Sequence, residues 1–114
     1  MILLIEYDTN LCNSIKKTLN KSKHKIHITD EYKDGLEYAK NHICDLVIID
    51  ISNNFEIISD VKKTHNKIKI MVISNHIDEE STTECFKLGA DDYMEKPINL
   101  IEFLIRVKKL LNER

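Results

Sequence analysis

The sequence predicts an α/β protein in which one parallel sheet carries helices on both of its faces. Its short apolar runs lack the alternation of a half-exposed strand, which indicates strands that are covered on both sides. Segments with apolar residues at helical spacing lie between these runs, so five β-α units follow one another along the chain. A length of 114 residues suits a single domain, residues 1–114, with a sizeable core.

The expected strands are short and mostly apolar. Residues 2–5, 46–49 and 68–73 are near-continuous runs of Ile, Leu, Val and Met. Residues 26–28 alternate with a period of two, and residues 93–94 fit a short fifth strand. Right-handed crossovers between parallel strands restrict the topology, although periodicity alone leaves the strand order open.

The expected helices have apolar residues that recur at helical spacing. They cover residues 11–19, 32–41, 55–61, 78–88 and 100–111. Gly89 is expected to end the fourth helix, where a left-handed residue is often needed. Asn99 and Glu102 have the spacing of a capping box at the start of the last helix.

Composition places the chain among soluble globular proteins. It is 42% hydrophobic and 32% charged, and no apolar run approaches the length of a membrane span. The first residue leads directly into an apolar strand, without the basic segment of a secretory signal, so we expect a cytoplasmic protein. The net charge of -2, with Lys and Arg interspersed among acids, argues against direct binding of nucleic acid by this domain. The scattered cysteines, Cys12, Cys44 and Cys85, form no CxxC pair and fit small apolar residues in a reducing compartment.

Polar residues stand where three of the expected strands end. Asp50 ends the third strand, Ser74 ends the fourth, and Lys96 follows the fifth. Because an open α/β sheet binds its ligands at the carboxyl edge of the strands, we expect these side chains to converge there. A carboxylate, a hydroxyl and an ammonium together have the composition of a phosphoryl-transfer pocket.

Three ordered motifs carry a family resemblance. The run GADDYMEKP at residues 89–97, the acid-ended run DLVIID at residues 45–50 and the opening run at residues 2–6 resemble the receiver domain of bacterial two-component response regulators. The resemblance covers essentially the whole chain. It implies the strand order 2-1-3-4-5 of the flavodoxin-like arrangement.

The resemblance also implies roles for the residues at the sheet edge. Asp50 matches the aspartate that accepts a phosphoryl group from a partner histidine kinase. Lys96 matches the lysine that contacts this carboxylate or its phosphate, and its bond to Pro97 is expected to be cis. Ser74 matches the switch hydroxyl, and Tyr93 matches the aromatic residue that moves with it. Taken alone, each residue has an ordinary interpretation, such as a strand-end serine or a surface lysine.

The metal site departs from the family pattern. The resemblance implies Mg²⁺ held by Asp50, the backbone carbonyl of Ser52 and two adjacent acids after the first strand. Glu6 fits the first acid, but neutral Tyr7 occupies the second position. Asp8 can substitute only if the loop shifts. We therefore expect magnesium binding to be weak or absent.

Two functions follow from this pattern. The first is a signalling receiver, rather than an enzyme, that is phosphorylated on Asp50 by a sensor histidine kinase and regulates an output such as transcription. The second is a phosphorylation-independent pseudo-receiver that acts as an interaction and dimerisation module, an interpretation that Tyr7 favours. A nucleotide-binding protein of the same fold is a poor third interpretation because no Gly-rich loop follows the first strand.

The runs at residues 89–97 and 99–107 most resemble regulators that carry a C-terminal winged-helix DNA-binding domain, which is not contained in these 114 residues. That resemblance implies a homodimer through the fourth helix, the fifth strand and the fifth helix. Asp92, Glu102 and Arg106 match its interface charges, with Asp92 and Arg106 paired across the two-fold axis. The alternative is that these charges are solvated or pair within one chain.

Overall fold

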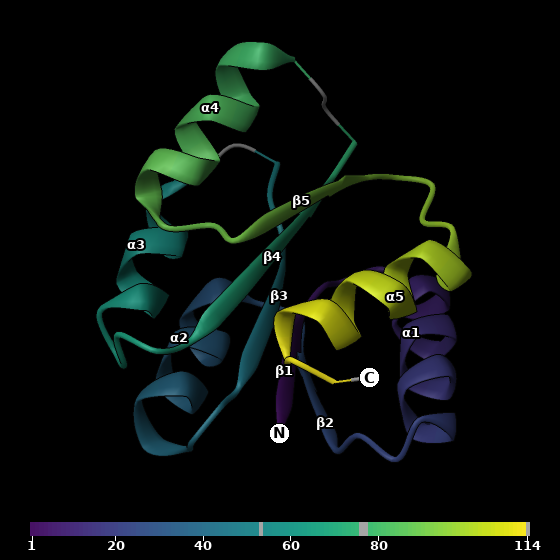
Figure 1. Cartoon of the computed structure of the whole chain (residues 1–114). Coiled ribbons are helices and arrows are strands. Elements are labelled where there is room, and N and C mark those ends of the chain that lie inside the picture. Colours follow the sequence, from purple (N-terminus) through teal and green to yellow (C-terminus); the bar gives the residue numbers. More distant parts are fainter. Residues whose placement is uncertain (53, 76–77, 114) are drawn as a thin grey trace.

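Five parallel strands form the centre of a computed structural model of the chain, which describes residues 1–52, 54–75 and 78–113 (Figure 1). The strands are β1 (Ile2–Ile5), β2 (Ile26–Thr29), β3 (Leu46–Asp50), β4 (Lys69–Ser74) and β5 (Asp92–Glu95). Their order in the sheet is β2-β1-β3-β4-β5, and every neighbouring pair is parallel. The predicted flavodoxin-like fold class is therefore confirmed.

Helices cover both faces of this sheet (Figure 1). They are α1 (Thr9–Lys21), α2 (Tyr32–Asn41), α3 (Glu56–Lys62), α4 (Glu79–Leu88) and α5 (Leu100–Leu110). Helices α1 and α5 pack on one face, and α2, α3 and α4 pack on the other. Within the described residues, no helix has both the length and the apolar character needed to cross a membrane.

The core consists of two apolar clusters, one on each side of the sheet. Successive strand residues point to opposite sides, so Val47 and Ile49 of β3 belong to one cluster while Leu46 and Ile48 belong to the other. This arrangement explains why the strands are apolar without alternation. All three cysteines are free and buried, where they pack as small apolar residues.

Local signals in the sequence define several helix ends. The Asn99 side chain caps α5 by accepting a hydrogen bond from the backbone N–H of Glu102 at 3.0 Å. Gly89 ends α4 with a φ of 120°, which confirms the expected left-handed residue. The Lys96–Pro97 peptide bond is cis, also as expected.

Gly35 brings α2 close to β1, a role that its place inside a helix does not reveal. A Cβ at this position would lie 2.6 Å from the Cγ1 atom of Ile5 and closer still to its Cδ1 atom. The side chain of Ile5 is 1% exposed and packed in the core, so it has little room to move. The missing Cβ therefore sets how closely α2 covers the strand that leads into the pocket.

Candidate functional site

The carboxyl edge of the sheet gathers the polar residues that the sequence singled out. Asp50 is the last residue of β3 and pairs with Ile73, next to Ser74 at the end of β4. The backbone N–H of Lys96 donates to the carbonyl of Ser74 at 2.8 Å, which fixes the chain just beyond β5. The parallel register thus brings the ends of β3, β4 and β5 together.

Glu6, Lys96 and Asp50 form a shielded ion triplet at this edge. The Lys96 Nζ atom lies 2.7 Å from Oε1 of Glu6 and 3.2 Å from Oδ1 of Asp50. The side chains of Glu6, Asp50 and Lys96 are 0%, 12% and 13% exposed, so water screens these charges poorly. The contact to Oε1 of Glu6 is a close ion pair, and no well-aligned hydrogen bond reaches that atom from a described residue.

Burial and charge act in opposite directions on the pKa values of this triplet. Burial raises the pKa of Glu6, while Lys96 opposes the rise. Burial alone would lower the pKa of Lys96, but its contacts with Glu6 and Asp50 raise it overall. The ammonium therefore remains charged at neutral pH, and it offsets one of the two carboxylates.

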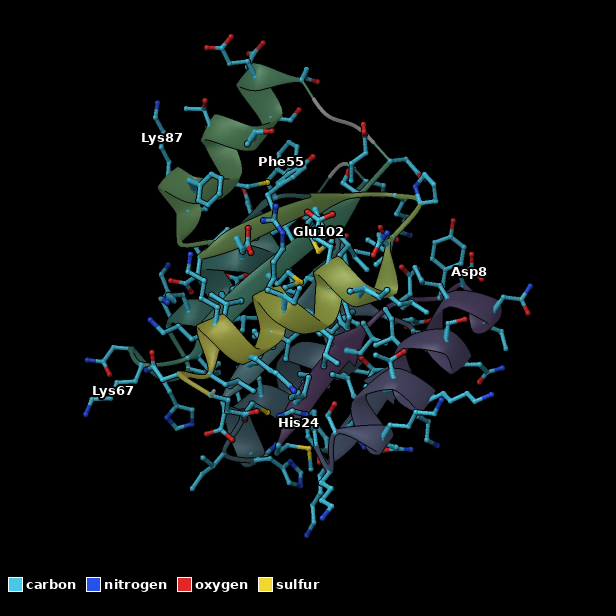
Figure 2. The ribbon with its side chains drawn as sticks, turned by 45° about the vertical axis from the view of Figure 1, so that its right-hand side comes forward. Asp8, His24, Phe55, Lys67, Lys87 and Glu102 are labelled. Atoms are coloured by element: carbon cyan, nitrogen blue, oxygen red, sulfur yellow. The ribbon has the colours of Figure 1, made fainter. Side chains whose placement is uncertain are left out.

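Tyr7 and Asp8 follow Glu6 but face other surroundings. Tyr7 is 74% exposed and borders an open hollow of about 250 Å³, which Glu6, Asp50 and Ser52 also line. Asp8 lies at the start of α1 (Figure 2), where its Oδ1 atom accepts hydrogen bonds from the backbone N–H groups of the second and third residues beyond it at 3.0 and 3.2 Å. The loop shift that would make Asp8 a metal ligand is not seen, because Asp8 caps this helix.

The residues that the structure describes do not make up a complete magnesium site. No group of three or more His, Cys, Asp or Glu side chains in the described part of the chain is placed to hold a metal ion. Mg²⁺ demands near-octahedral oxygen ligands and usually keeps several waters. Glu6 and Asp50 supply carboxylates and Ser52 lies beside the hollow, but Glu6 is fully buried and Lys96 stands between the two acids. Weak or absent magnesium binding therefore stays a prediction, which these positions favour.

The two switch residues lie beside the pocket. Ser74 is 3% exposed at the end of β4, and its neighbour in the β5 register is Glu95. Tyr93 is half-buried on β5, pairs with Val72 of β4 and packs against the cluster under α3 and α4. Both residues therefore connect the edge of the sheet to its α4 side.

Tyr32 is a pocket residue that sequence reasoning missed. It is the first residue of α2, and its hydroxyl donates a hydrogen bond to the backbone carbonyl of Asp50 at 2.5 Å. Burial, followed by the charge of Asp50, raises the pKa of Tyr32, so the phenol stays protonated as a donor. A tyrosine opening a helix carries no signal for a contact with a strand eighteen residues away.

The predicted interface charges meet within a single chain. The Nη1 atom of Arg106 donates to Oδ1 of Asp92 at 2.6 Å, and its Nε and Nη2 atoms reach Oε1 of Glu102 at 3.1 and 3.0 Å. Glu102 lies on α5, which crosses in front of the sheet (Figure 2). The structure therefore shows the intrachain pairing that the sequence left open as the alternative, and pairing across a two-fold axis stays a prediction.

The fold and its edge define a doubly wound α/β protein with an acidic pocket, a largely shielded lysine and a strand-end hydroxyl. The model of the response regulator receiver domain family matches residues 2–108. The chain belongs to this family, and it is thus a receiver domain of a two-component system.

Known relatives agree with this assignment. The cell cycle response regulator CtrA of Brucella ovis is 25% identical over 114 residues, which cover 96% of this chain and 49% of the relative. The chain thus spans about half the length of the curated relatives it matches. HP1043, an orphan response regulator of H. pylori, has a structure with a TM-score of 0.91 and 30% identity, covering 96% of this chain and 94% of that one. A CheY-like receiver domain protein of Methanospirillum hungatei gives a TM-score of 0.92 at 24% identity, over 97% of this chain and 92% of that one.

Proposed function

We propose that Asp50 accepts a phosphoryl group from a sensor histidine kinase in the cytoplasm, and that this modification controls an output such as transcription. The observation that carries the proposal is the placement of the Asp50 carboxylate 3.2 Å from the Lys96 ammonium, beside an open hollow. A carboxylate that lines an open hollow next to a largely shielded ammonium is suited to receiving a negatively charged group.

Phosphoryl transfer needs positioning and charge neutralisation more than covalent chemistry from the protein. In the proposed step, an Asp50 carboxylate oxygen forms the new P–O bond while the P–N bond of the kinase phosphohistidine breaks. The electron pair leaves with the imidazole nitrogen of the kinase. Lys96 offsets the negative charge that repels the incoming phosphoryl group, and the Ser74 hydroxyl lies at the end of the neighbouring strand.

The proposed output uses the surface of α4, β5 and α5. Ser74 and Tyr93 connect the pocket to this side, and the charges of Asp92, Glu102 and Arg106 lie on it. We expect phosphorylation to change the affinity of this surface for a second copy of the chain. The domain itself acts as a signalling module and contacts nucleic acid only through other parts of a regulator, in keeping with its net charge of -2.

Intact mass spectrometry tests the acceptor. After incubation with acetyl phosphate, the wild-type mass should rise by one phosphoryl group, and Asp50→Asn should abolish the rise. Incubations with magnesium chloride and with EDTA separate a metal requirement from a failure to accept. A phosphorylated Asp50→Asn protein would show that another residue is the acceptor.

One observation favours the second candidate function, a phosphorylation-independent interaction module. Tyr7 replaces an acid, and the described residues hold no complete metal site. Such a module would form the same dimer without modification. A wild-type protein that dimerises equally well before and after treatment, and whose Asp50→Asn variant dimerises as tightly, would support this function over the first.

A further inference from the structure

We propose that the Lys96 ammonium is the resident cation of this pocket, so that the Asp50 site works without a divalent metal ion. This proposal rests on the proposed function, because a metal-free site matters only if Asp50 accepts a phosphoryl group. The cation in the pocket can nevertheless be measured without phosphorylation. Three features of the structure support it.

The first feature is the position of the ammonium. Its Nζ atom lies within 3.2 Å of carboxylate oxygens from both Glu6 and Asp50, and it therefore bridges the two acids as a metal ion would. Two carboxylates and one ammonium leave a local charge of -1. The two carboxylates alone would attract a divalent ion with a charge of -2. While Lys96 stays in place, the net charge that attracts the ion is only half as large.

The second feature is access to Glu6. Its side chain is completely shielded, and the lysine beside it is only 13% exposed. A magnesium ion keeps most of its water and needs ligand oxygens that this hydrated shell can reach. The magnesium ion can bind Glu6 only after the ammonium withdraws, which would leave a largely shielded cation without one of its partners.

The third feature is the supply of ligands. Position 7 offers an exposed phenol in place of a carboxylate. The Asp8 carboxylate accepts hydrogen bonds from backbone N–H groups at the N-terminus of α1. Asp30 and Glu31 also line the hollow, but both are exposed residues outside the ion triplet. No three of the described acids are placed to hold a metal ion, so nothing replaces the missing ligand.

Paramagnetic broadening of the wild-type protein tests the proposal directly. Manganese(II), a spectroscopic substitute for magnesium, broadens the amide signals of residues close to it. We expect no selective broadening of Glu6, Tyr7 and Ser52 at millimolar metal, and no rise in thermal midpoint above about 1 °C with magnesium chloride. Selective broadening at these amides in the wild type would overturn the proposal.

Two variants test whether Lys96 excludes the metal. Tyr7→Asp restores an acid beside the pocket, and adding Lys96→Met to that variant removes the competing ammonium. We expect the second change to tighten magnesium binding by about tenfold or more, as measured by titration calorimetry. Lys62→Met is a matched control in the same background, because Lys62 is also paired with a carboxylate but lies away from the pocket. An unchanged dissociation constant after Lys96→Met would contradict the proposed competition.

The phosphodonor experiment then separates the two proposals. Phosphorylation of Asp50 in EDTA as well as in magnesium supports both of them. Phosphorylation of Asp50 only in magnesium would support Asp50 as the acceptor. It would overturn the proposal that Lys96 makes a divalent ion unnecessary. A wild-type protein that shows no selective broadening by manganese and no phosphorylation in either buffer would support Lys96 as the resident cation. The same result would contradict the proposed acceptor function of Asp50.

Discussion

Arg106 and Asp92 are joined within one chain by a hydrogen-bonded ion pair of 2.6 Å between Nη1 and Oδ1. Glu102 binds the other nitrogen atoms of the same guanidinium, so the network ties α5 to the first residue of β5. The Arg106 and Asp92 side chains are 37% and 20% exposed, and such pairs typically contribute about 0–1 kcal/mol. A dimer on this face must therefore either keep these intrachain ion pairs or replace them with pairs between the two chains.

The first prediction concerns that dimer. Arg106→Glu should weaken self-association through like-charge repulsion, and adding Asp92→Arg should restore it because the pair is then reversed. Ile105 of α5 is 62% exposed, lies beside Asp92, Glu102 and Arg106, and would contribute apolar affinity. Sedimentation velocity at several protein and salt concentrations measures the effect. Recovery of unfolding stability without recovery of association would show that the charges act only within one chain.

The second prediction is a pH dependence that arises from Glu6. Its folded-state pKa is raised by burial above the ordinary value of 4.5, so the folded protein binds this proton more tightly than the unfolded chain does. The stability that Glu6 contributes is fully present below about pH 4.5 and is lost as the pH rises through the folded-state pKa. Lys96 stays charged across this range, because its pKa is raised above 10.5.

Urea unfolding at several pH values between acid and neutral measures this effect against Glu6→Gln, which cannot titrate. The unfolding free energy of wild type minus that of Glu6→Gln should be largest at the acid end and fall toward neutral pH. Glu95→Gln is a control, because Glu95 lies exposed at the end of β5. A difference that stays constant or grows with pH would contradict the direction of the pKa shift.

The third prediction concerns Gly35. Gly35→Ala should destabilise the fold by about 1–3 kcal/mol despite the better helix propensity of alanine, because its Cβ would overlap the buried Ile5 side chain. The Ile5→Val change removes the Cδ1 atom. Gly35→Ala should therefore cost less stability in an Ile5→Val background than in the wild type. Lys33→Ala, at an exposed position of the same helix, should change stability by less than about 0.5 kcal/mol. A Gly35→Ala protein as stable as wild type would show that α2 can move away from β1 at no cost.

The sequence allows the fold class to be predicted because its signals are local and mutually consistent. Apolar strands, helical spacing and the Asn99 cap each follow from neighbouring residues, and the family motifs supply the strand order. The role of Gly35 could not be predicted in this way. It depends on a contact with Ile5, which is distant in the sequence and close only after folding.

The candidate site shows the same division between local and non-local information. Asp50, Lys96 and Ser74 could be chosen because each stands where a recognisable strand ends. The pairing of Lys96 with Glu6 and the hydrogen bond from Tyr32 to the Asp50 backbone could not, because both join residues far apart in the chain. These contacts determine the charge and access of the pocket.

The most direct test of the proposed acceptor is to locate the phosphoryl group on the chain. Borohydride reduces an aspartyl phosphate to homoserine, so peptide mass spectrometry after acetyl phosphate treatment can identify the modified position. We predict homoserine at position 50 in the wild type and at no position in Asp50→Asn. Homoserine at another aspartate, or no homoserine in a protein whose mass has risen by one phosphoryl group, would contradict the assignment of Asp50.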